Sequence, residues 1–424
     1  MTVVVACALI AACMILGVPI AMSIGLGSIY YFLLAERPLM MIPQKMFTTV
    51  DNFTLLAVPL FILAGTIMNT GGITRRLFNF ARTCVGHITG GLGHVCVLAS
   101  IIFAGMSGSA TADAVGLGSI EIPAMEKEGY DKDFASAIVL GASTIGPIIP
   151  PSIIMVIYGV VAGVSVGALF VAGIIPGLIM GGALMVGVYL ISKKRNYPSY
   201  PRSTMRTFLR ATVEAFPVLL TPVIIIGGIY SGYFTPTEAA MIAVVYAIIL
   251  GFFYREMSWR TLWRILRETS VTVGVIMFII GITGAFAWWL SLEKIPLLFT
   301  NLIYSFTQDR ILILILINVI ILIEGCFLDA TPIVLIMVPI LMPLLKILNV
   351  DMVYFGILIA VNTMIGLTTP PVGVCLFGVS AIAKLSIEQI VRAYLPFLAI
   401  LVIVLFILIF FPQLSTFLPN LLFR

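Results

Sequence analysis

The chain has 424 residues, of which 61% are hydrophobic and 10% are charged, and its formal net charge is +5. A soluble domain carries about 25% charged residues, and so few charged side chains cannot cover the surface of a soluble protein of this length. The composition therefore excludes a water-soluble enzyme, a nucleic-acid-binding protein and a disordered chain. It predicts an all-α, polytopic protein in a lipid bilayer, and the small positive excess is typical of basic cytoplasmic loops.

The first apolar segment, residues 2–34, has no basic start and is too long for the core of a signal peptide. We therefore expect it to be a retained membrane span. The apolar runs that follow predict full or partial spans. They are residues 55–68, 92–104, 134–164, 168–191, 213–230, 239–253, 271–290, 311–323, 354–382 and 394–411.

Two longer segments are interrupted by a polar stretch that contains glycine. The interruptions are residues 105–113, within segment 92–128, and residues 324–332, within segment 311–348. Non-helical backbone inside a membrane survives only where protein or a watery cavity surrounds it. Two half-length apolar arms around such a tip therefore predict a re-entrant hairpin in each segment.

Basic residues gather in three stretches. Residues 193–210 hold six basic residues and no acid, which predicts a cytoplasmic loop by the positive-inside rule. Residues 255–267 mix Trp and Arg at near-helical spacing, which predicts a helix lying at the membrane interface. Residues 74–82 are similar.

An ungapped shift of 220 positions places unusual residues of the first half on the same residue types of the second half. The coincidences are Gly105 with Gly325, Ala110-Thr111 with Ala330-Thr331, Pro123 with Pro343, Asp131 with Asp351, Ile145-Gly146 with Ile365-Gly366, Pro150-Pro151 with Pro370-Pro371, and Pro176 with Pro396. Prolines and glycines in one register indicate an internal duplication. Duplicated, interrupted hydrophobic segments are typical of secondary transporters, whose sites lie near the middle of the bilayer.

Each half also carries a proline break, at residues 146–152 and at residues 366–371. Proline removes an amide donor and leaves neighbouring carbonyls without partners. Those carbonyls and nearby hydroxyls are hard oxygen ligands suited to Na⁺, and unwound helix ends direct amides toward an anion. A single break would equally suit a proline kink repaired by neighbouring helices. Two breaks in register, each paired with a polar tip, favour ion and substrate sites.

Acidic residues inside the apolar segments add candidates. Asp113 and Asp329 lie at the two tips, where an ionised carboxylate needs a partner, although they are not repeat mates. Glu324 is a further candidate. Glu238 follows Thr235-Pro236-Thr237 and predicts a helix-capping residue rather than a site.

Nothing in the sequence favours catalysis or a transition-metal centre. The six cysteines are scattered without a close pair and are expected to be buried thiols. His87 and His94 are too few for a metal site. Ser109 has no nearby base to make it a nucleophile, so we expect no enzyme activity and no organic cofactor.

Five stretches carry a family resemblance: residues 56–65, 107–113, 150–152, 227–240 and 366–371. In order and across the chain, they resemble the large membrane subunit of tripartite ATP-independent periplasmic (TRAP) transporters. The resemblance implies an elevator-type, Na⁺-coupled importer of a small organic acid in the bacterial inner membrane. It implies two related, inverted repeats whose hairpins and broken helices form a transport domain beside scaffold helices.

The resemblance also implies site residues. A first Na⁺ site would use Ser107, Ser109, Gly146, Ile149 and Pro151, and a second would use Gly325, Gly366, Thr369 and Val372. The substrate and ion region would include Asp113, Thr111, Asp329, Thr331, Pro150, Ser152 and Pro370. Na⁺ is the only metal expected.

The implied domain organisation has four parts: scaffold helices in 1–90, the first repeat core in 91–192, a basic loop and scaffold helices in 193–310, and the second repeat core in 311–424. The implied partners are a small four-helix membrane subunit on a separate chain and a periplasmic substrate-binding protein. The family carries sialic acid, C4-dicarboxylates and keto acids, and overall likeness favours sialic acid slightly. The alternative is a Na⁺/dicarboxylate carrier of similar architecture that works alone.

Overall fold

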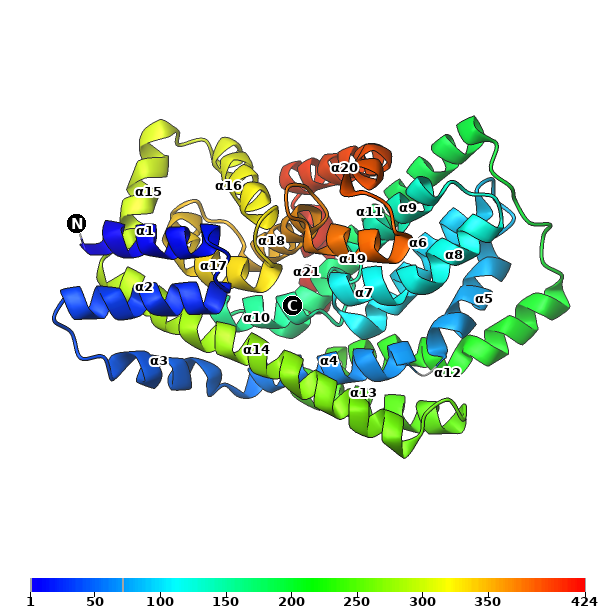
Figure 1. The fold of residues 1–424 in the computed structure, drawn as a ribbon, viewed down its shortest axis with the longest axis horizontal. Helices are drawn as coiled ribbons and strands as arrows, with labels where there is room; N and C mark the ends of the chain where they lie inside the picture. Colours follow the sequence, from blue (N-terminus) through cyan, green and yellow to red (C-terminus); the bar gives the residue numbers. More distant parts are fainter. Residues whose placement is uncertain (1, 71, 424) are drawn as a thin grey trace.

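The computed structural model describes residues 2–70 and 72–423, and within them the chain is helical, with no β-strand (Figure 1). The first eleven α-helices are α1 Thr2–Ile15, α2 Ile20–Leu34, α3 Met41–Val50, α4 Ala57–Thr70, α5 Ile73–Val85, α6 Gly91–Ser107, α7 Ala110–Gly116, α8 Gly118–Lys127, α9 Lys132–Ser143, α10 Ile153–Ala162 and α11 Val166–Arg195. The remaining ones are α12 Met205–Tyr230, α13 Pro236–Phe253, α14 Trp259–Leu292, α15 Ile295–Phe306, α16 Arg310–Gly325, α17 Ala330–Ile347, α18 Met352–Leu367, α19 Val374–Ala383, α20 Ile387–Phe410 and α21 Gln413–Leu422. A 3₁₀ turn, η1 Phe53–Leu56, precedes α4.

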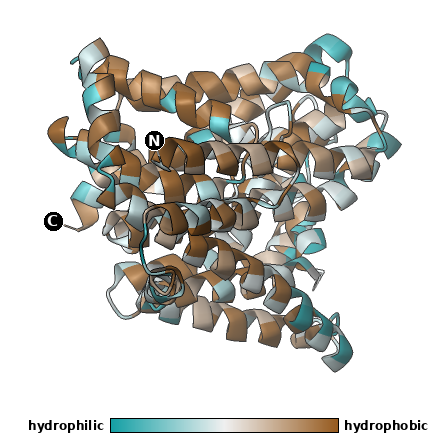
Figure 2. Cartoon of the chain, turned by 60° about the vertical axis from the view of Figure 1, so that its left-hand side comes forward, coloured by the Kyte–Doolittle hydropathy of each residue, from teal (hydrophilic) through white to brown (hydrophobic). Residues whose placement is uncertain are grey.

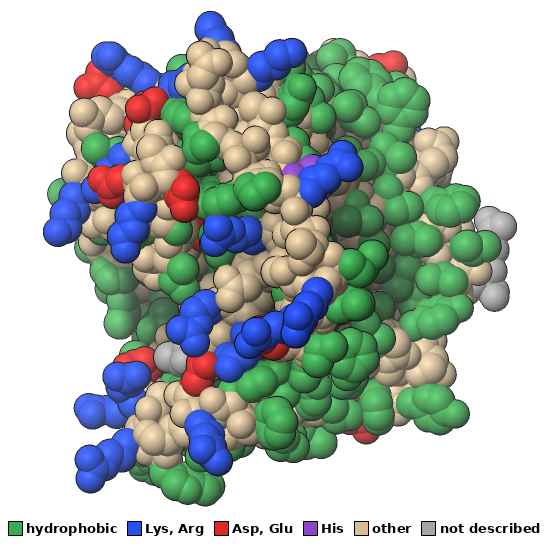
Figure 3. Space-filling model, turned by 90° about the vertical axis from the view of Figure 1, so that its right-hand side faces the viewer, with side chains coloured by type: hydrophobic (Ala, Val, Ile, Leu, Met, Phe, Trp, Pro, Cys, Tyr) green, Lys and Arg blue, Asp and Glu red, His purple; other side chains and the backbone are tan. Residues whose placement is uncertain are grey.

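Six helices of the described chain are long and apolar enough to cross a membrane: α11, α12, α13, α14, α17 and α20. Several others are apolar but of about half that length. Hydrophobic residues cover most helices, and hydrophilic residues gather toward the ends of the molecule (Figure 2). Many Lys and Arg side chains lie on the face shown in Figure 3. The prediction of a polytopic α-helical membrane protein is confirmed.

Two predictions about single elements are wrong. Residues 2–34 do not form one span, because α1 ends at Ile15 and α2 begins at Ile20. Gly17 adopts a φ of 82° between them, and Pro19 lacks an amide for the ladder. Residues 259–267 do not form a separate interfacial helix. They are the first turns of α14, which runs unbroken for 34 residues because neither Gly nor Pro interrupts its start.

The first interrupted segment forms a hairpin whose arms are α6 and α8. At its base the Leu92 amide donates to the Tyr130 hydroxyl, at 3.3 Å. Further along, Cys96 of α6 meets Glu121 of α8. The chain reverses at Gly108, which has a φ of 61°. The second segment is likewise interrupted, since α16 ends at Gly325 and α17 begins at Ala330.

The 220-residue shift relates helix ends as well as residues. α7 begins at Ala110 and α17 at Ala330, α8 ends at Lys127 and α17 at Ile347, and α9 and α18 begin at Lys132 and Met352. α10 packs on α17, and α19 packs on α7. The part of each broken helix after the break therefore rests on the hairpin of the other half, near the middle of the molecule (Figure 1).

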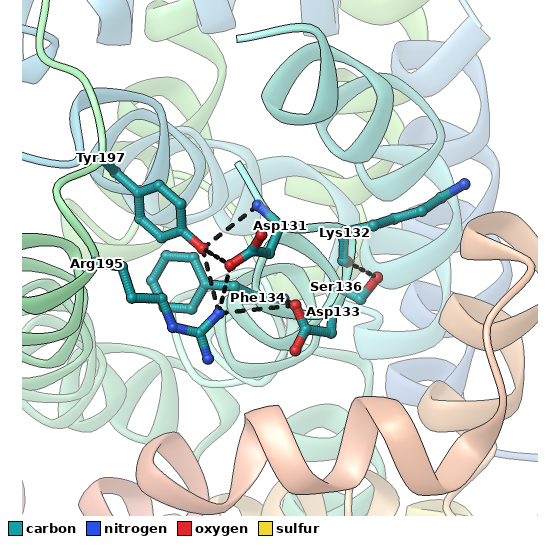
Figure 4. Close-up of polar contacts among 7 residues, drawn as sticks. All are labelled: Asp131, Lys132, Asp133, Phe134, Ser136, Arg195 and Tyr197. Carbon is teal, nitrogen blue, oxygen red and sulfur yellow. Dashed lines mark hydrogen bonds and ion pairs between the residues drawn. The ribbon is translucent and has the colours of Figure 1, made fainter. Parts of the chain in front are cut away.

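The segment that follows α11 is held against the base of the first hairpin (Figure 4). The Asp131 carboxylate accepts from the Arg195 guanidinium at 2.9 Å and from the Tyr197 hydroxyl at 2.6 Å. The Tyr197 ring stacks on Tyr130 and Phe134, with ring centroids 4.6 and 5.0 Å apart. The basic loop thus begins from a fixed point on the hairpin.

Candidate functional site

A cavity of about 900 Å³ lies between the two hairpin tips, α4 and the long helix α14. Five residues predicted for the site line it: Ser107, Ser109, Thr111, Asp329 and Thr331. Polar side chains on the opposite wall come from α4 and α14. These are Thr66, Asn69, Glu268 and Thr272.

The first tip owes its shape to local hydrogen bonds and to a glycine. Ser109 caps α7 by accepting from the Ala112 amide, and its hydroxyl lies 3.1 Å from that of Thr111. Gly108 is in the left-handed region, and a Cβ there would lie 2.6 Å from the carbonyl oxygen of Pro151. Glycine therefore lets the tip touch the first proline break.

Asp113 lies behind this tip and not on the cavity wall. Its side chain is buried and accepts a hydrogen bond from the Ser107 hydroxyl. A Cβ on Gly146 would lie 2.1 Å from the other carboxylate oxygen, which has no hydrogen-bond partner among the described residues. The structure thus brings Ser107, Asp113, Gly146 and Pro151 together.

The first break spans residues 144–152 between α9 and α10. Pro150 and Pro151 are buried there, and Ser152 caps α10 by accepting from the Met155 amide at 3.2 Å. No hydrogen bond from another described residue reaches the carbonyl oxygens of Gly146, Ile149 or Pro151. These oxygens are uncommitted, as a helix unwound by proline predicts.

The second break contacts the second tip through the backbone atoms of two glycines. A Cβ on Gly325 would lie 2.9 Å from the Gly366 Cα, so only glycine fits this contact. The amides of Val372 and Gly373 donate to the Cys326 carbonyl at 3.2 and 3.3 Å. The Thr369 hydroxyl donates to the Ile365 carbonyl at 2.7 Å. The four residues predicted for the second Na⁺ site therefore belong to one tip-and-break junction.

The two junctions differ in exposure. The first break is buried, whereas Pro370 is half-buried and Val372 is exposed. Asp329 is also exposed, and its carboxylate accepts from the Ala330 amide at 2.8 Å. Pro150, Ser152 and Pro370 do not line the cavity; Pro147 does so instead.

The charge of the cavity is negative. Asp329 and Glu268 are the charged side chains among its described lining residues, which include no Lys, Arg or His. An anionic ligand would be repelled here unless cations were bound close by. Glu324 lies outside the cavity, and Glu238 forms the predicted capping box with Thr235.

Sequence reasoning missed the α4 and α14 wall of the cavity. Asn69, Glu268 and Thr272 stand near the ends of apolar runs that contain neither a break nor a repeat. Their spacing in the sequence does not indicate a shared site, because only the packing of α4 and α14 against the tips brings these residues to the same cavity.

Two kinds of comparison agree on the family. The family described as "Tripartite ATP-independent periplasmic transporter, DctM component" matches residues 7–414. The chain is 43% identical to the sialic acid TRAP transporter large permease protein SiaM of Vibrio cholerae, over 96% of this chain and 95% of that protein. It is 41% identical to the C4-dicarboxylate TRAP transporter large permease protein DctM of Pseudomonas aeruginosa, over 94% of each.

A solved structure of the YdaH transporter of Alcanivorax borkumensis superposes with a TM-score of 0.67 at 13% identity, covering 86% of each chain. At that identity the likeness shows the fold alone. The family match and the relatives together carry the assignment, and these relatives are permeases rather than enzymes. The chain belongs to the DctM family of TRAP transporter large permease subunits.

Proposed function

We propose that the chain imports a small organic acid with Na⁺ as the coupling ion. The observation that carries the proposal is the cavity, whose described charged lining residues are two acids. A carboxylate substrate entering it needs cations to offset Asp329 and Glu268. Relatives named for sialic acid and for C4-dicarboxylates support a substrate of one of these classes.

The two tip-and-break junctions suit Na⁺ chemically. The uncommitted carbonyl oxygens of Gly146, Ile149 and Pro151, with the hydroxyls of Ser107 and Ser109, would hold one ion. Gly325, Gly366, Thr369 and Val372 would supply backbone oxygens and a hydroxyl to a second. Neutral hard oxygens at unwound helix ends are the ligands by which membrane transporters bind Na⁺.

The proposed movement is that of an elevator. The two hairpins and two broken helices would move as one inverted-repeat transport domain along scaffold helices that include α4 and α14. The position of the cavity between these groups supports this division. As the tips move, the cavity would come to lie against a different part of the scaffold. The bound ions would move together with the tips.

The proposed setting is the bacterial inner membrane, with the Lys- and Arg-rich face toward the cytoplasm. A periplasmic binding protein would deliver the substrate and a small membrane subunit would pack on the scaffold. The chain matches 67% of the length of the sialic acid TRAP transporter permease protein SiaT of Haemophilus influenzae.

Uptake into proteoliposomes tests the proposal. Vesicles holding the chain and its small subunit are supplied with a binding protein loaded with labelled sialic acid or with a labelled C4-dicarboxylate. We expect uptake of one substrate, driven by an inward Na⁺ gradient and abolished when K⁺ replaces Na⁺. Uptake indifferent to Na⁺ would refute the coupling, and full uptake by the chain alone would favour the carrier that needs no partners.

A further inference from the structure

A buried acid inside the first hairpin has no role in the transport scheme. Glu121 of α8 is 1% exposed and faces Cys96 of α6, whose thiol donates to one carboxylate oxygen at 2.8 Å. The other oxygen has no hydrogen-bond partner among the described residues. No side-chain nitrogen of a described Lys, Arg or His lies within 4 Å of either oxygen. An ionised carboxylate in such a place is unfavourable, so a proton is the natural occupant.

The second hairpin provides an internal control. The 220-residue shift places Glu121 on Leu341 and Cys96 on Leu316. Leu341 is fully buried and Leu316 packs against the same core. A hairpin of this shape therefore forms with leucine at both positions. Packing alone does not require the acid–thiol pair of the first hairpin.

Glu121 also has an acidic neighbour toward the tip. Asp113 lies eight residues earlier in the chain, on α7, and α7 packs directly on α8. Asp113 accepts from Ser107, a residue of the proposed first Na⁺ site. A negative charge on Glu121 would therefore attract a cation to that site, and a proton on Glu121 would remove the attraction.

Other titratable groups near α8 do not offset this charge. α8 packs on α6, α7, α9 and α19. The titratable residues on or next to these elements are His94 and Cys96 (α6), Asp113 (α7), Asp131, Lys132 and Asp133 (α9), Cys375 and Lys384 (α19), and Glu126, Lys127 and Glu128 (α8). Lys132 is paired with Glu126, at 3.6 Å. Among them, Cys96 is the hydrogen-bond partner of Glu121.

We propose that Glu121 is a proton-binding site that opposes Na⁺ binding at the first tip-and-break junction. The inference rests on the proposed Na⁺ coupling and adds to it a second ion of opposite effect. By linkage, ionisation of Glu121 strengthens Na⁺ binding, and Na⁺ binding favours release of the proton. The concentration of Na⁺ needed for half-maximal uptake should fall as pH rises.

The test measures half-maximal Na⁺ at several pH values in proteoliposomes with the same buffer on both sides. The wild type should need at least about fivefold less Na⁺ at the alkaline end of its stable range. Glu121→Gln should need the acid-end concentration at every pH. Glu126→Gln, a change in an exposed acid of the same helix, should keep the wild-type profile.

Two further variants separate the proton site from a structural role. Glu121→Leu with Cys96→Leu reproduces the residues of the second hairpin and should fold, transport and ignore pH. Cys96→Ala removes the donor that stabilises the ionised carboxylate, so the pH at which the Na⁺ requirement changes should move upward. A purely structural pair would lower activity without moving that pH.

Infrared spectroscopy of the purified chain detects the protonated carboxyl group of Glu121 directly. This measurement does not depend on transport activity. A carboxyl band that titrates in the wild type should be missing in Glu121→Gln. Wild-type uptake that needs no Na⁺ refutes the proposed function and leaves the infrared result to decide the proton site. A Na⁺ requirement that does not change with pH, or an identical profile in Glu121→Gln, overturns the inference.

Discussion

Asp131 and Asp351 begin equivalent helices of the two halves but bind different partners. Asp351 caps α18 by accepting from the amides of Val353 and Tyr354, at 2.8 and 2.9 Å. Asp131 makes no such cap, and its carboxylate instead holds Arg195 and Tyr197. The equivalent aspartates thus have different roles. Asp351 caps its own helix, whereas Asp131 holds the end of α11 and the segment that follows it.

The aromatic ring of Tyr197 should contribute more to the stability of this attachment than the ion pair between Arg195 and Asp131. Tyr197 is buried and stacks on two aromatic rings, so Tyr197→Ala should lower the free energy of unfolding by about 3 kcal/mol. Arg195→Gln breaks a half-exposed ion pair and should remove about 0.5 kcal/mol. Thermal unfolding in detergent gives both values, and the reverse order would show that charge dominates.

The hydroxyl of Tyr197 makes the attachment sensitive to alkali. Burial and the hydrogen bond to Asp131 raise the pKa of this phenol. The stabilisation is complete below the unfolded value of about 10 and is lost as pH rises through the higher folded value. Alkaline unfolding should therefore be less steep in Tyr197→Phe than in the wild type. Equal slopes would mean that this hydroxyl does not contribute.

The glycine contact at the second junction should tolerate no side chain. Gly366→Ala would bring a Cβ within 2.5 Å of the Gly325 Cα, which forces the tip and the break apart. We expect a loss of about 2 kcal/mol in stability, as for an overpacked core, and a larger loss in uptake. Gly182→Ala is the matched control, because nothing lies within 4 Å of its added Cβ.

The serine hydroxyls of the first tip should set the Na⁺ requirement. Ser107→Ala with Ser109→Ala removes two oxygens while barely changing volume. Half-maximal uptake should then need about tenfold more Na⁺, equivalent to about 1.4 kcal/mol. Ser119→Ala, which alters an exposed hydroxyl outside the cavity, should leave the requirement unchanged. An unaltered Na⁺ response in the double variant would remove the first site.

Replacing the prolines of a break should restore a continuous helix and abolish transport. Pro150→Ala with Pro151→Ala returns two amides to the chain and withdraws carbonyls from the proposed ion. Both prolines lie in the unwound segment 144–152, where the returned amides can extend the flanking helices, so the chain should still fold while uptake collapses. The same change at Pro370 and Pro371 should behave alike. A double variant that unfolds, or one that transports normally, would contradict the functional break.

The tips and breaks could be predicted from sequence because their signal is local. Gly108, Pro150 and the residues around Asp329 interrupt apolar runs that would otherwise continue. The match of helix ends at a shift of 220 positions follows from the same residues. Such interruptions act through backbone conformation and missing amides, which neighbouring sequence determines.

The rest depends on packing between distant segments. Nothing local indicates that Glu268 of α14 and Asp329, just before α17, line the same cavity. Nor does any local pattern indicate that Tyr197 stacks on the rings of Tyr130 and Phe134. The start of α14 was misread for a related reason. Its Trp and Arg residues suit the membrane interface, but helix propensity carries the same helix onward into the span.

The crossed packing of the broken helices has a consequence for biosynthesis. α10 rests on α17, which the ribosome makes more than 150 residues later. During translation α10 already has α4 and η1 as neighbours, but the surface that later contacts α17 stays uncovered. The first half is therefore incomplete until α17 has been made. A nascent chain halted before Ala330 should accordingly be the species that membrane quality-control proteases cut, whereas completion of α19 on α7 closes both halves at once.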